Sequence, residues 1–403
     1  MKQNQLIKSY GSSIILILAI IFGSIVGYFL GEKARIFESI ANLFLNLLFC
    51  IVVPLIFVSL VSSIANSKTS SIFGKTIVIM VIVFAISGII SSVFGLFVCS
   101  LIEFNPNIIL SEKINDIHSS ADVLSIFTVG NFYELFARKN LIPLIVFALF
   151  FGVALLKCKN DCPTVINFFN ELNKAISKMV NFIMMFAPIG LACFFAVLFG
   201  TTGGQITADI SKAIIIFFIL SPVYFIAHNA IFAYTANGFS GVKSLFKNIL
   251  TSVAVALGTC SSVAVIPSNI QAGKKIGISE GVNTLVISLA ASLHKPGSVV
   301  LAIFKMAVLC AIYDIDLFTI ENMIKAVIVA ILVGSVVGPI PTGGYISEML
   351  VVGSFGLPAA EALPIAILIG TVADAPATML NAASDVSATM CVDKFVNKGK
   401  ENE

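Results

Sequence analysis

The stretch LVISLAASLHKPGSVVLAIF (residues 285–304) decides the fold, because it places a charge and a helix breaker inside an apolar run. Its central residues HKPG (294–297) have apolar segments on both sides, and residues 283–313 contain no acidic residue that would neutralise the charge. Within hydrocarbon, non-helical backbone is tolerated only where it is buried in protein or lines a watery cavity. We therefore predict a membrane helix that is broken at a functional site.

Composition indicates that the rest of the chain also lies in a membrane. The 403 residues are 58% hydrophobic and only 11% charged, whereas charged residues make up about a quarter of a typical soluble domain. The net charge of +3 is small and gives no reason to expect nucleic-acid binding. We expect an all-α, multi-pass protein of the cell (inner) membrane.

Six apolar runs in the first 234 residues are predicted to cross the membrane. They cover residues 13–30, 43–64, 76–102, 141–156, 180–200 and 213–234. Lysine residues gather before the first run, after alternate runs and at the end of the chain. Because cytoplasmic loops carry an excess of Lys and Arg, we predict that both termini are cytoplasmic.

Beyond residue 244 the apolar segments become shorter and are interrupted by Gly, Pro and Ser. The interruptions are LGTCSSVAVIPS (257–268), SLHKPGS (292–298) and GSVVGPIPTGGY (334–345), and a polar final run follows at 364–392. Small residues also permit close packing of membrane helices, which is the structural alternative. Three interruptions followed by a polar helix favour a binding site.

Four polar residues of the final run, Asp374, Thr378, Asn381 and Asp385, are spaced to share one helix face. A carboxylate at membrane depth is costly unless it faces a partner, an ion or water. Asp374 and Asn381 are suited to the ammonium and the carboxylate of an amino acid. Asp385 is suited to a hard cation such as Na⁺ together with backbone carbonyls. The alternative is that these groups only bond to other helices.

Several motifs together resemble the dicarboxylate/amino acid:cation symporter family, which includes glutamate/aspartate transporters and bacterial serine/threonine transporters. They are NLIPLIVFALFFGVAL (140–155), MMFAPIGLA (184–192), TCSSVAVIP (259–267), KKIGISEGV (274–282), PIPTGGY (339–345) and DAPATMLNAASDVSAT (374–389). The resemblance implies eight transmembrane helices, two re-entrant helical hairpins, a homotrimer and an elevator mechanism. It assigns helices 1 and 2 of a scaffold to residues 1–75, helix 3 of the transport part and scaffold helix 4 to 76–156, scaffold helix 5 to 157–210, and the transport core to 211–403.

The resemblance also implies roles for individual residues. Asp374 would bind the substrate ammonium and Asn381 the α-carboxylate, while the second hairpin tip would act as a gate. The implied substrate-binding residues are Ser261, Ser262, Pro339, Ile340, Pro341, Thr342, Gly343, Gly344, Asp374, Ala377, Thr378 and Asn381. Asn381 and Asp385 would be Na⁺ ligands, with Na⁺ as a coupling ion.

Two departures from the family pattern concern the substrate. Ala377 stands where acidic-substrate members place an arginine, and Cys260 stands where some prokaryotic members place another. A buried, unpaired second carboxylate is costly. The expected substrate is therefore a small neutral amino acid, similar to serine or threonine.

A third departure concerns the cation. The family's broken helix reads N-M-D-G-T, whereas this chain reads H-K-P-G-S at 294–298. The expected cation site or coupling group comprises His294, Lys295, Gly297, Ser298, Asn381 and Asp385. For Lys295 three hypotheses stay open: a tethered cation paired with Asp385, proton coupling through Lys295 or His294, or a side chain in a watery vestibule without a role.

The sequence thus predicts a secondary transporter that imports a small neutral amino acid by symport with Na⁺ or H⁺. The alternatives are an uncoupled exchanger or facilitator in which Lys295 replaces a bound cation, a symporter of dicarboxylates or acidic amino acids, and an ion conductance. No nucleophile–base pair, metal-ligand spacing or ATP-binding signature occurs in the sequence. We therefore expect no enzyme activity and no cofactor. The expected partners are an amino acid, membrane lipid and two further copies of the chain.

Overall fold

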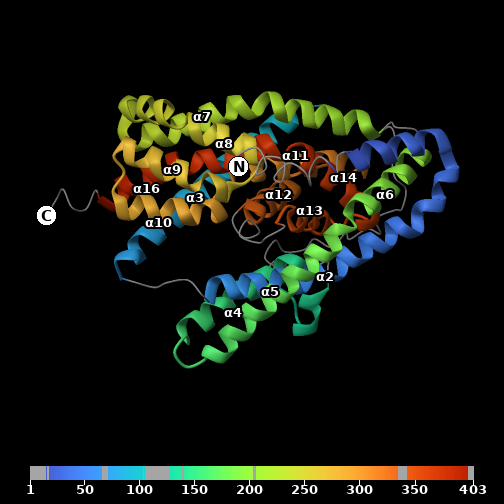
Figure 1. The fold of residues 1–403 in the computed structure, drawn as a ribbon, viewed down its shortest axis with the longest axis horizontal. Coiled ribbons are helices and arrows are strands. Elements are labelled where there is room, and N and C mark those ends of the chain that lie inside the picture. The colour runs from blue at the N-terminus through green and yellow to red at the C-terminus, as the bar shows by residue number, and fades with distance from the viewer. Residues whose placement is uncertain are drawn as a thin grey trace, which may run out of the picture.

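The computed structural model describes residue 15 and residues 18–65, 71–102, 104, 128–137, 140–202, 206–334 and 343–397. In these ranges all regular structure is helical (Figure 1). Residues 18–30 are helical as well, and the remaining elements are η1 (Gly31–Phe37), α2 (Glu38–Ala65), α3 (Ser71–Ser100), η3 (Phe132–Phe136), α4 (Leu141–Lys157), α5 (Pro163–Met185), α6 (Ala187–Thr202), α7 (Ile206–Asn248), α8 (Leu250–Thr259), α9 (Ser262–Ile276), α10 (Glu280–Leu293), α11 (Pro296–Ile312), α12 (Ile320–Leu332), α13 (Gly343–Ser354), α14 (Ala359–Val372), α15 (Asp374–Thr378), the π-helical η6 (Met379–Ala383) and α16 (Ser384–Asn397).

The helices form two groups that lie side by side (Figure 1). In the first group, α2 packs against α4, α5 and α6, and α6 packs against η1. In the second group, α16 packs against α7, α3 and α10, while α11 packs against α3, α12 and α7. Contacts of α13 with α4 and α2, and of α14 with α6, join the two groups.

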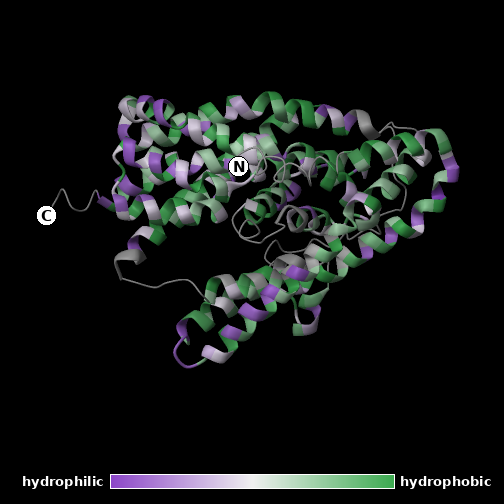
Figure 2. Cartoon of the chain, viewed as in Figure 1, coloured by the Kyte–Doolittle hydropathy of each residue, from purple (hydrophilic) through white to green (hydrophobic). Residues whose placement is uncertain are grey.

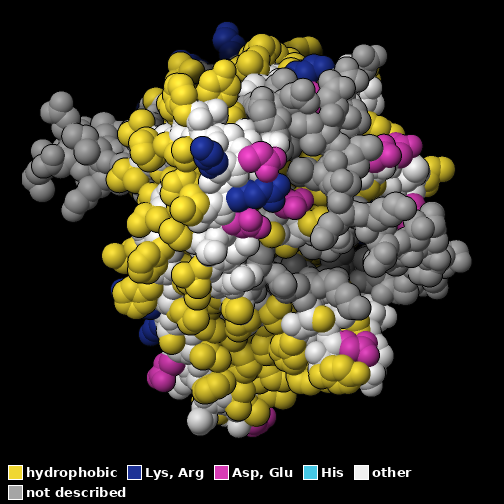
Figure 3. Space-filling view, turned by 90° about the vertical axis from the view of Figure 1, so that its right-hand side faces the viewer, with side chains coloured by type: hydrophobic (Ala, Val, Ile, Leu, Met, Phe, Trp, Pro, Cys, Tyr) yellow, Lys and Arg dark blue, Asp and Glu magenta, His cyan; other side chains and the backbone are white. Residues whose placement is uncertain are grey.

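The outer surface of the second group is apolar and its interior contains polar residues. On α3 a stripe of large apolar side chains is exposed, whereas Ser87, Ser91 and Ser92 on the opposite face are buried. Green apolar segments cover most of the ribbon in Figure 2, and apolar side chains cover much of the face in Figure 3. A polar face turned inward and an apolar face turned outward are typical of a membrane protein.

Three described helical spans are long and apolar enough to cross a membrane: Lys75–Ser100, Asp209–Asn248 and Glu280–Ile312. The pair Ala359–Val372 and Asp374–Asn397, bent by 66°, gives a fourth if it is one span. These helices confirm that the chain is a multi-pass membrane protein. The expected count of eight spans and two re-entrant hairpins stays a prediction, because Pro143–Lys157 and Ala187–Thr201 are apolar but shorter.

The predicted helix break is confirmed. Helix α10 ends at Leu293 and α11 begins at Pro296. Between them His294 (φ −115°, ψ 99°) and Lys295 (φ −129°, ψ 58°) have non-helical backbone. Pro296 fits the first position of α11, because proline lacks the N–H that would have no helical acceptor there.

The helices α8 and α9 form a hairpin at the first predicted tip. Cys260 ends α8 in the left-handed region (φ 47°), and Ser261 caps α9 by accepting a hydrogen bond from the Ala264 N–H. Both helices contact η6. Of the second predicted tip, Pro339–Thr342 lie outside the described residues, and for Gly343 and Gly344 only the helical backbone at the start of α13 is described.

The final polar run differs from the regular helix that its spacing predicted. Thr378 ends α15, Asn381 lies in the π-helical η6, and Asp385 lies in α16. A π-helical turn contains more residues than an α-helical turn, so it changes the direction of the side chains that follow. The four residues therefore do not form one regular α-helical stripe.

The predicted span at residues 180–200 is also interrupted, because α5 ends at Met185 and α6 begins at Ala187. Pro188 lies directly after this break. Proline restricts the residue before it and removes a helical hydrogen bond, which accounts for the end of α5.

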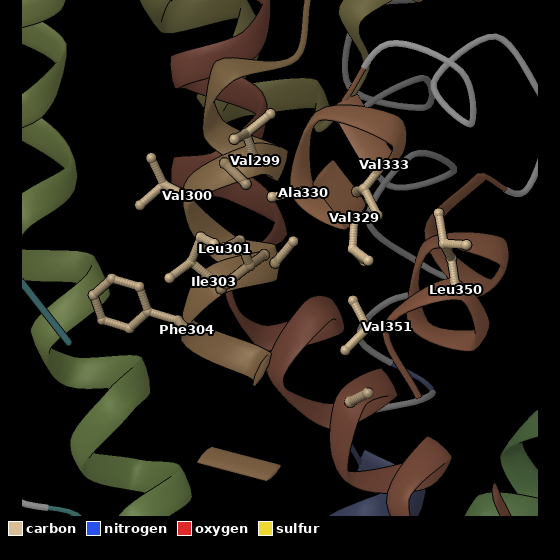
Figure 4. Packing of buried hydrophobic residues seen from close by; sticks show 14 of the residues in the cluster. Val299, Val300, Leu301, Ile303, Phe304, Val329, Ala330, Val333, Leu350 and Val351 are labelled. Carbon is tan, nitrogen blue, oxygen red and sulfur yellow. The ribbon is translucent and has the colours of Figure 1, made fainter. Parts of the chain in front are cut away.

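The interior of the second group is apolar around α11, whose side chains pack against α12 and α13 (Figure 4). One buried ion pair crosses this interior: Lys305 Nζ of α11 lies 2.6 and 2.7 Å from the two carboxylate oxygens of Glu348 of α13. Ser347 also donates to Glu348. A β-carbon at Gly370 would overlap the Glu348 carboxylate, so the pair fits against bare backbone of α14.

The start of α11 approaches α15 closely, and this generates a stability prediction. A β-carbon at Gly297 would overlap the carbonyl oxygen of Ala377, whereas one at Gly281 of α10 would meet no atom within 4 Å. We expect Gly297→Ala to lower the free energy of unfolding by about 1–3 kcal/mol, because overpacking strains a close-packed interior. Gly281→Ala is the matched control and should be neutral or stabilising. Thermal melting of both purified variants tests this, and equal melting temperatures would contradict it.

The buried pair of Lys305 and Glu348 generates a second prediction. Glu348→Leu alone should destabilise the protein by about 3–5 kcal/mol, because it leaves the Lys305 ammonium buried without a counter-charge. Adding Lys305→Met to Glu348→Leu should recover most of the loss, since the two apolar side chains pack without an orphaned charge. Melting temperatures of the single and double variants measure this coupling. A double variant no more stable than Glu348→Leu would show that the pair is not the source of the stability.

Candidate functional site

The broken helix and the last helix meet at a buried His–Asp contact. His294 Nδ1 lies 2.9 Å from Asp385 Oδ1, and both side chains are 1% exposed. The His294 ring stacks on Phe84 of α3, with the ring centroids 4.7 Å apart. Asp385 Oδ2 is buried and has no hydrogen-bond partner among the residues that the structure describes. The Asp385 carboxylate is therefore held by an imidazole on one oxygen.

A serine of α3 links two histidines. Ser87 Oγ lies 2.8 Å from His294 Nε2 and 2.8 Å from His228 Nε2 of α7. One turn away, Ser91 Oγ lies 2.7 Å from the Tyr224 hydroxyl of α7. These contacts join α3, α7 and the helix break through hydrogen bonds in an otherwise apolar interior, where an unpaired polar group is costly.

Asn381 joins η6 to the first turn of α11. Its Oδ1 accepts a hydrogen bond from the Ser298 N–H at 3.0 Å, and its Nδ2 donates to Ser298 Oγ at 3.0 Å. The first N–H groups of a helix have no acceptor within the helix, so the Asn381 amide satisfies one of them. The close approach needs Gly297, because a side chain there would overlap α15.

Lys295 and Asp374 lie in the more accessible part of the site. Lys295 is half-buried, and its Nζ donates to Ser262 Oγ at the start of α9 over 2.7 Å. Asp374 is half-buried as well, and its Oδ1 accepts from Thr378 Oγ1 over 3.2 Å. Asp374 interacts electrostatically with both Lys295 and Lys305. The half-buried ammonium and carboxylate are two groups of opposite charge that attract each other without a direct contact.

The structure places most of the predicted residues at this one junction. Ser262, His294, Lys295, Gly297, Ser298, Asp374, Ala377, Thr378, Asn381 and Asp385 lie on α9, the helix break, α11, α15, η6 and α16, which pack together. Ser261 lies at the tip between α8 and α9. The direct contact of Asp385 is with His294, whereas the tethered-cation hypothesis paired it with Lys295.

Sequence reasoning missed several members of the network. Neither His228, nor Ser87, nor the ion pair of Lys305 and Glu348 was predicted as part of the site. The sequence did contain a signal for the ionisable members, because an ionisable residue inside an apolar span is a candidate functional residue by default. Their partners were not predictable, since the contacting residues lie 43 to 207 positions apart.

The fit of a sodium ion depends on the same contacts. His294 occupies one carboxylate oxygen of Asp385, and Asn381 Oδ1 accepts from Ser298. The Lys295 ammonium interacts electrostatically with Asp385, and a positive charge opposes a bound cation. Asp385 Oδ2 is the oxygen of these two side chains that has no partner. A sodium ion at this place would therefore compete with cationic or hydrogen-bonded groups of the chain itself.

Comparison with known proteins gives a consistent picture. A proton/sodium-glutamate symport protein of Bacillus caldotenax is 24% identical over 406 residues, which cover 96% of this chain and 94% of that protein. A proton/glutamate-aspartate symporter of Bacillus subtilis (strain 168) is 22% identical over 408 residues, covering 96% and 95%. A C4-dicarboxylate transport protein of Acidovorax ebreus (strain TPSY) is 24% identical over 344 residues, covering 82% and 76%. The model of the sodium:dicarboxylate symporter family matches residues 13–395, and the chain belongs to this family.

Proposed function

We propose that the protein is a secondary transporter that imports a dicarboxylate or an acidic amino acid together with a cation. The observation that carries this proposal is the Lys295 ammonium, which lies on Ser262 in the accessible part of the site. The relatives reported above are named as carriers of glutamate, aspartate or C4-dicarboxylates. Their names support the acidic-substrate alternative better than the neutral amino acid expected from Ala377.

The site residues keep the roles that the resemblance implied, as a proposal. Asp374 binds the ammonium of an amino-acid substrate, and Thr378 orients the Asp374 carboxylate through their hydrogen bond. Asn381 and the backbone at Ser261 and Ser262 bind a substrate carboxylate. For Asn381 this requires an exchange of partners, because its amide is bonded to Ser298 in this structure.

For the coupling cation we propose a proton and not a sodium ion at Asp385. The description of the family names sodium as the transported cation, and the names of some relatives include a proton as well. In this chain the His294 imidazole already contacts one oxygen of the Asp385 carboxylate, so a sodium ion would have to share that carboxylate with the imidazole. A sodium ion needs several coordinating oxygens, whereas a proton does not. The proton is therefore the driving cation that we propose.

The assembly and its movement are also proposals. The first helix group would form the scaffold and the second group the transport part, except for residues at the boundaries between the two parts. Three copies joined through the scaffold would let each transport part move as an elevator, with both termini in the cytoplasm. The apolar exterior of α3 and α7 suits a body that faces lipid or an apolar partner surface.

The substrate proposal is tested with the purified protein in proteoliposomes. We expect saturable uptake of radiolabelled glutamate or succinate that excess aspartate inhibits and excess serine does not. The physical reason is that a cationic site gains a charge-assisted hydrogen bond from a second carboxylate. A thermal-shift screen with the twenty amino acids and succinate gives an independent measurement. Stabilisation by serine or threonine alone would restore the neutral-amino-acid hypothesis.

The coupling proposal predicts sodium-independent substrate binding. Replacing sodium chloride with choline chloride should leave the substrate-dependent melting temperature unchanged, because His294 holds Asp385. His294→Asn should introduce sodium dependence, since it frees the Asp385 carboxylate and supplies an amide oxygen. His228→Asn is the control, because it removes the other imidazole on Ser87 and leaves Asp385 covered. Sodium-dependent binding by the unmodified protein would contradict the proposal, and uptake seen only as counterflow would indicate an uncoupled exchanger.

A further inference from the structure

Five charged side chains form one electrostatically connected cluster inside the second helix group. They are Lys295, Lys305, Glu348, Asp374 and Asp385. The two lysines differ in their partners and exposure. Lys305 is 4% exposed and contacts both oxygens of Glu348, so its charge is neutralised by the chain itself. Lys295 is half-buried, and among the described residues its ammonium contacts a hydroxyl, that of Ser262.

The Lys295 ammonium carries three N–H donors, and Ser262 Oγ accepts one of them. None of the described carboxylates lies within ion-pair distance of this ammonium, although Asp385 and Asp374 attract it from further away. An ammonium held in an apolar protein without a close counter-charge is costly, and a bound anion removes the cost. Lys295 is thus the cation of the cluster that has donors left for a ligand.

Exposure separates the residues that a ligand can reach from those that hold the helices together. His294, Asp385, Ser87 and His228 are at most 2% exposed. Ser262, Lys295, Ser298 and Asp374 are half-buried and come from α9, the helix break, α11 and α15. Because Asp374 attracts a cation and Lys295 an anion, the reachable part of the site complements a molecule that bears both charges.

We propose that the Lys295 ammonium binds a carboxylate of the transported substrate and thereby selects acidic substrates over their neutral analogues. The inference rests on the proposed function and names the residue that determines its specificity. Ser262 Oγ fixes the position of the ammonium, so the carboxylate meets a pre-oriented donor. The carboxylate is the side-chain group of an acidic amino acid or the second acid group of a dicarboxylate. Residues 373–378 of the neighbouring helix contain no cation that would take this role.

The experiment compares each acid with its own amide on the purified, full-length protein. Dissociation constants are measured for L-glutamate and L-glutamine, and for succinate and succinamate. We expect the unmodified protein to prefer the acid, and Lys295→Met to lower the acid-to-amide affinity ratio by at least about tenfold, because a charge-assisted hydrogen bond is lost. Lys295→Arg should keep most of the preference. The glutamate and succinate arms show whether the carboxylate belongs to an amino acid or to a simple dicarboxylate.

Two controls keep the test decisive. Lys275→Met removes an exposed lysine of α9 and should leave the ratio unchanged. Lys295→Gln keeps a donor for Ser262 without a charge, so it tests the charge even if Lys295→Met does not fold. Loss of the acid preference in Lys295→Gln supports the inference. If the unmodified protein binds the acids and both variants keep the full preference, this inference alone is wrong. If the unmodified protein binds neither acid, the proposed function is wrong as well.

Discussion

The contact between His294 and Asp385 is the constraint on which the rest of the site depends. A carboxylate that is 1% exposed in a membrane protein needs a partner, because water is not available to solvate it. The imidazole reaches Asp385 because the helix is interrupted at His294 and Lys295, where the backbone is non-helical. The break in the helix and the buried carboxylate therefore support each other. Neither is stable alone, since a break in an apolar span frees backbone groups that must find partners.

The helix break and the first turn of α11 direct three residues toward four elements of the fold. His294 contacts α16 and α3, Lys295 contacts α9, and Ser298 contacts η6. A ligand that takes the Lys295 ammonium or the Asn381 amide thus acts directly on the junction of four elements. This arrangement gives a physical route by which substrate binding changes the packing of the helices around it.

Much of this architecture could be predicted from the sequence, and the exceptions have physical causes. Pro296 and Gly297 identified the break, and the acidic residues of the last helix identified the site. The partner of Asp385 could not be predicted, because the non-helical backbone at 294–295 determines which of two adjacent basic side chains faces α16. The π-helical turn at Met379–Ala383 was not predictable either, since its Met, Leu and Ala residues are ordinary helix formers and its Asn381 bonds to a residue 83 positions away. Pro188 was a sequence signal for the break that precedes it, but the continuous apolar run at 180–200 favoured the prediction of a single span.

The contacts of the charged cluster determine which movements of the helices would separate paired charges. All of its members lie on α11, α13, α15, α16 or the helix break, and their side-chain partners lie on α9 or on these same elements. Every one of these elements belongs to the second helix group. A displacement of this group as one body would therefore break none of the described contacts of the cluster and expose no buried charge to lipid. A movement within the group would separate His294 from Asp385 or Lys305 from Glu348, at a cost of several kcal/mol for each pair. The rigid-body movement proposed above would therefore be less costly for this cluster than a movement within the group.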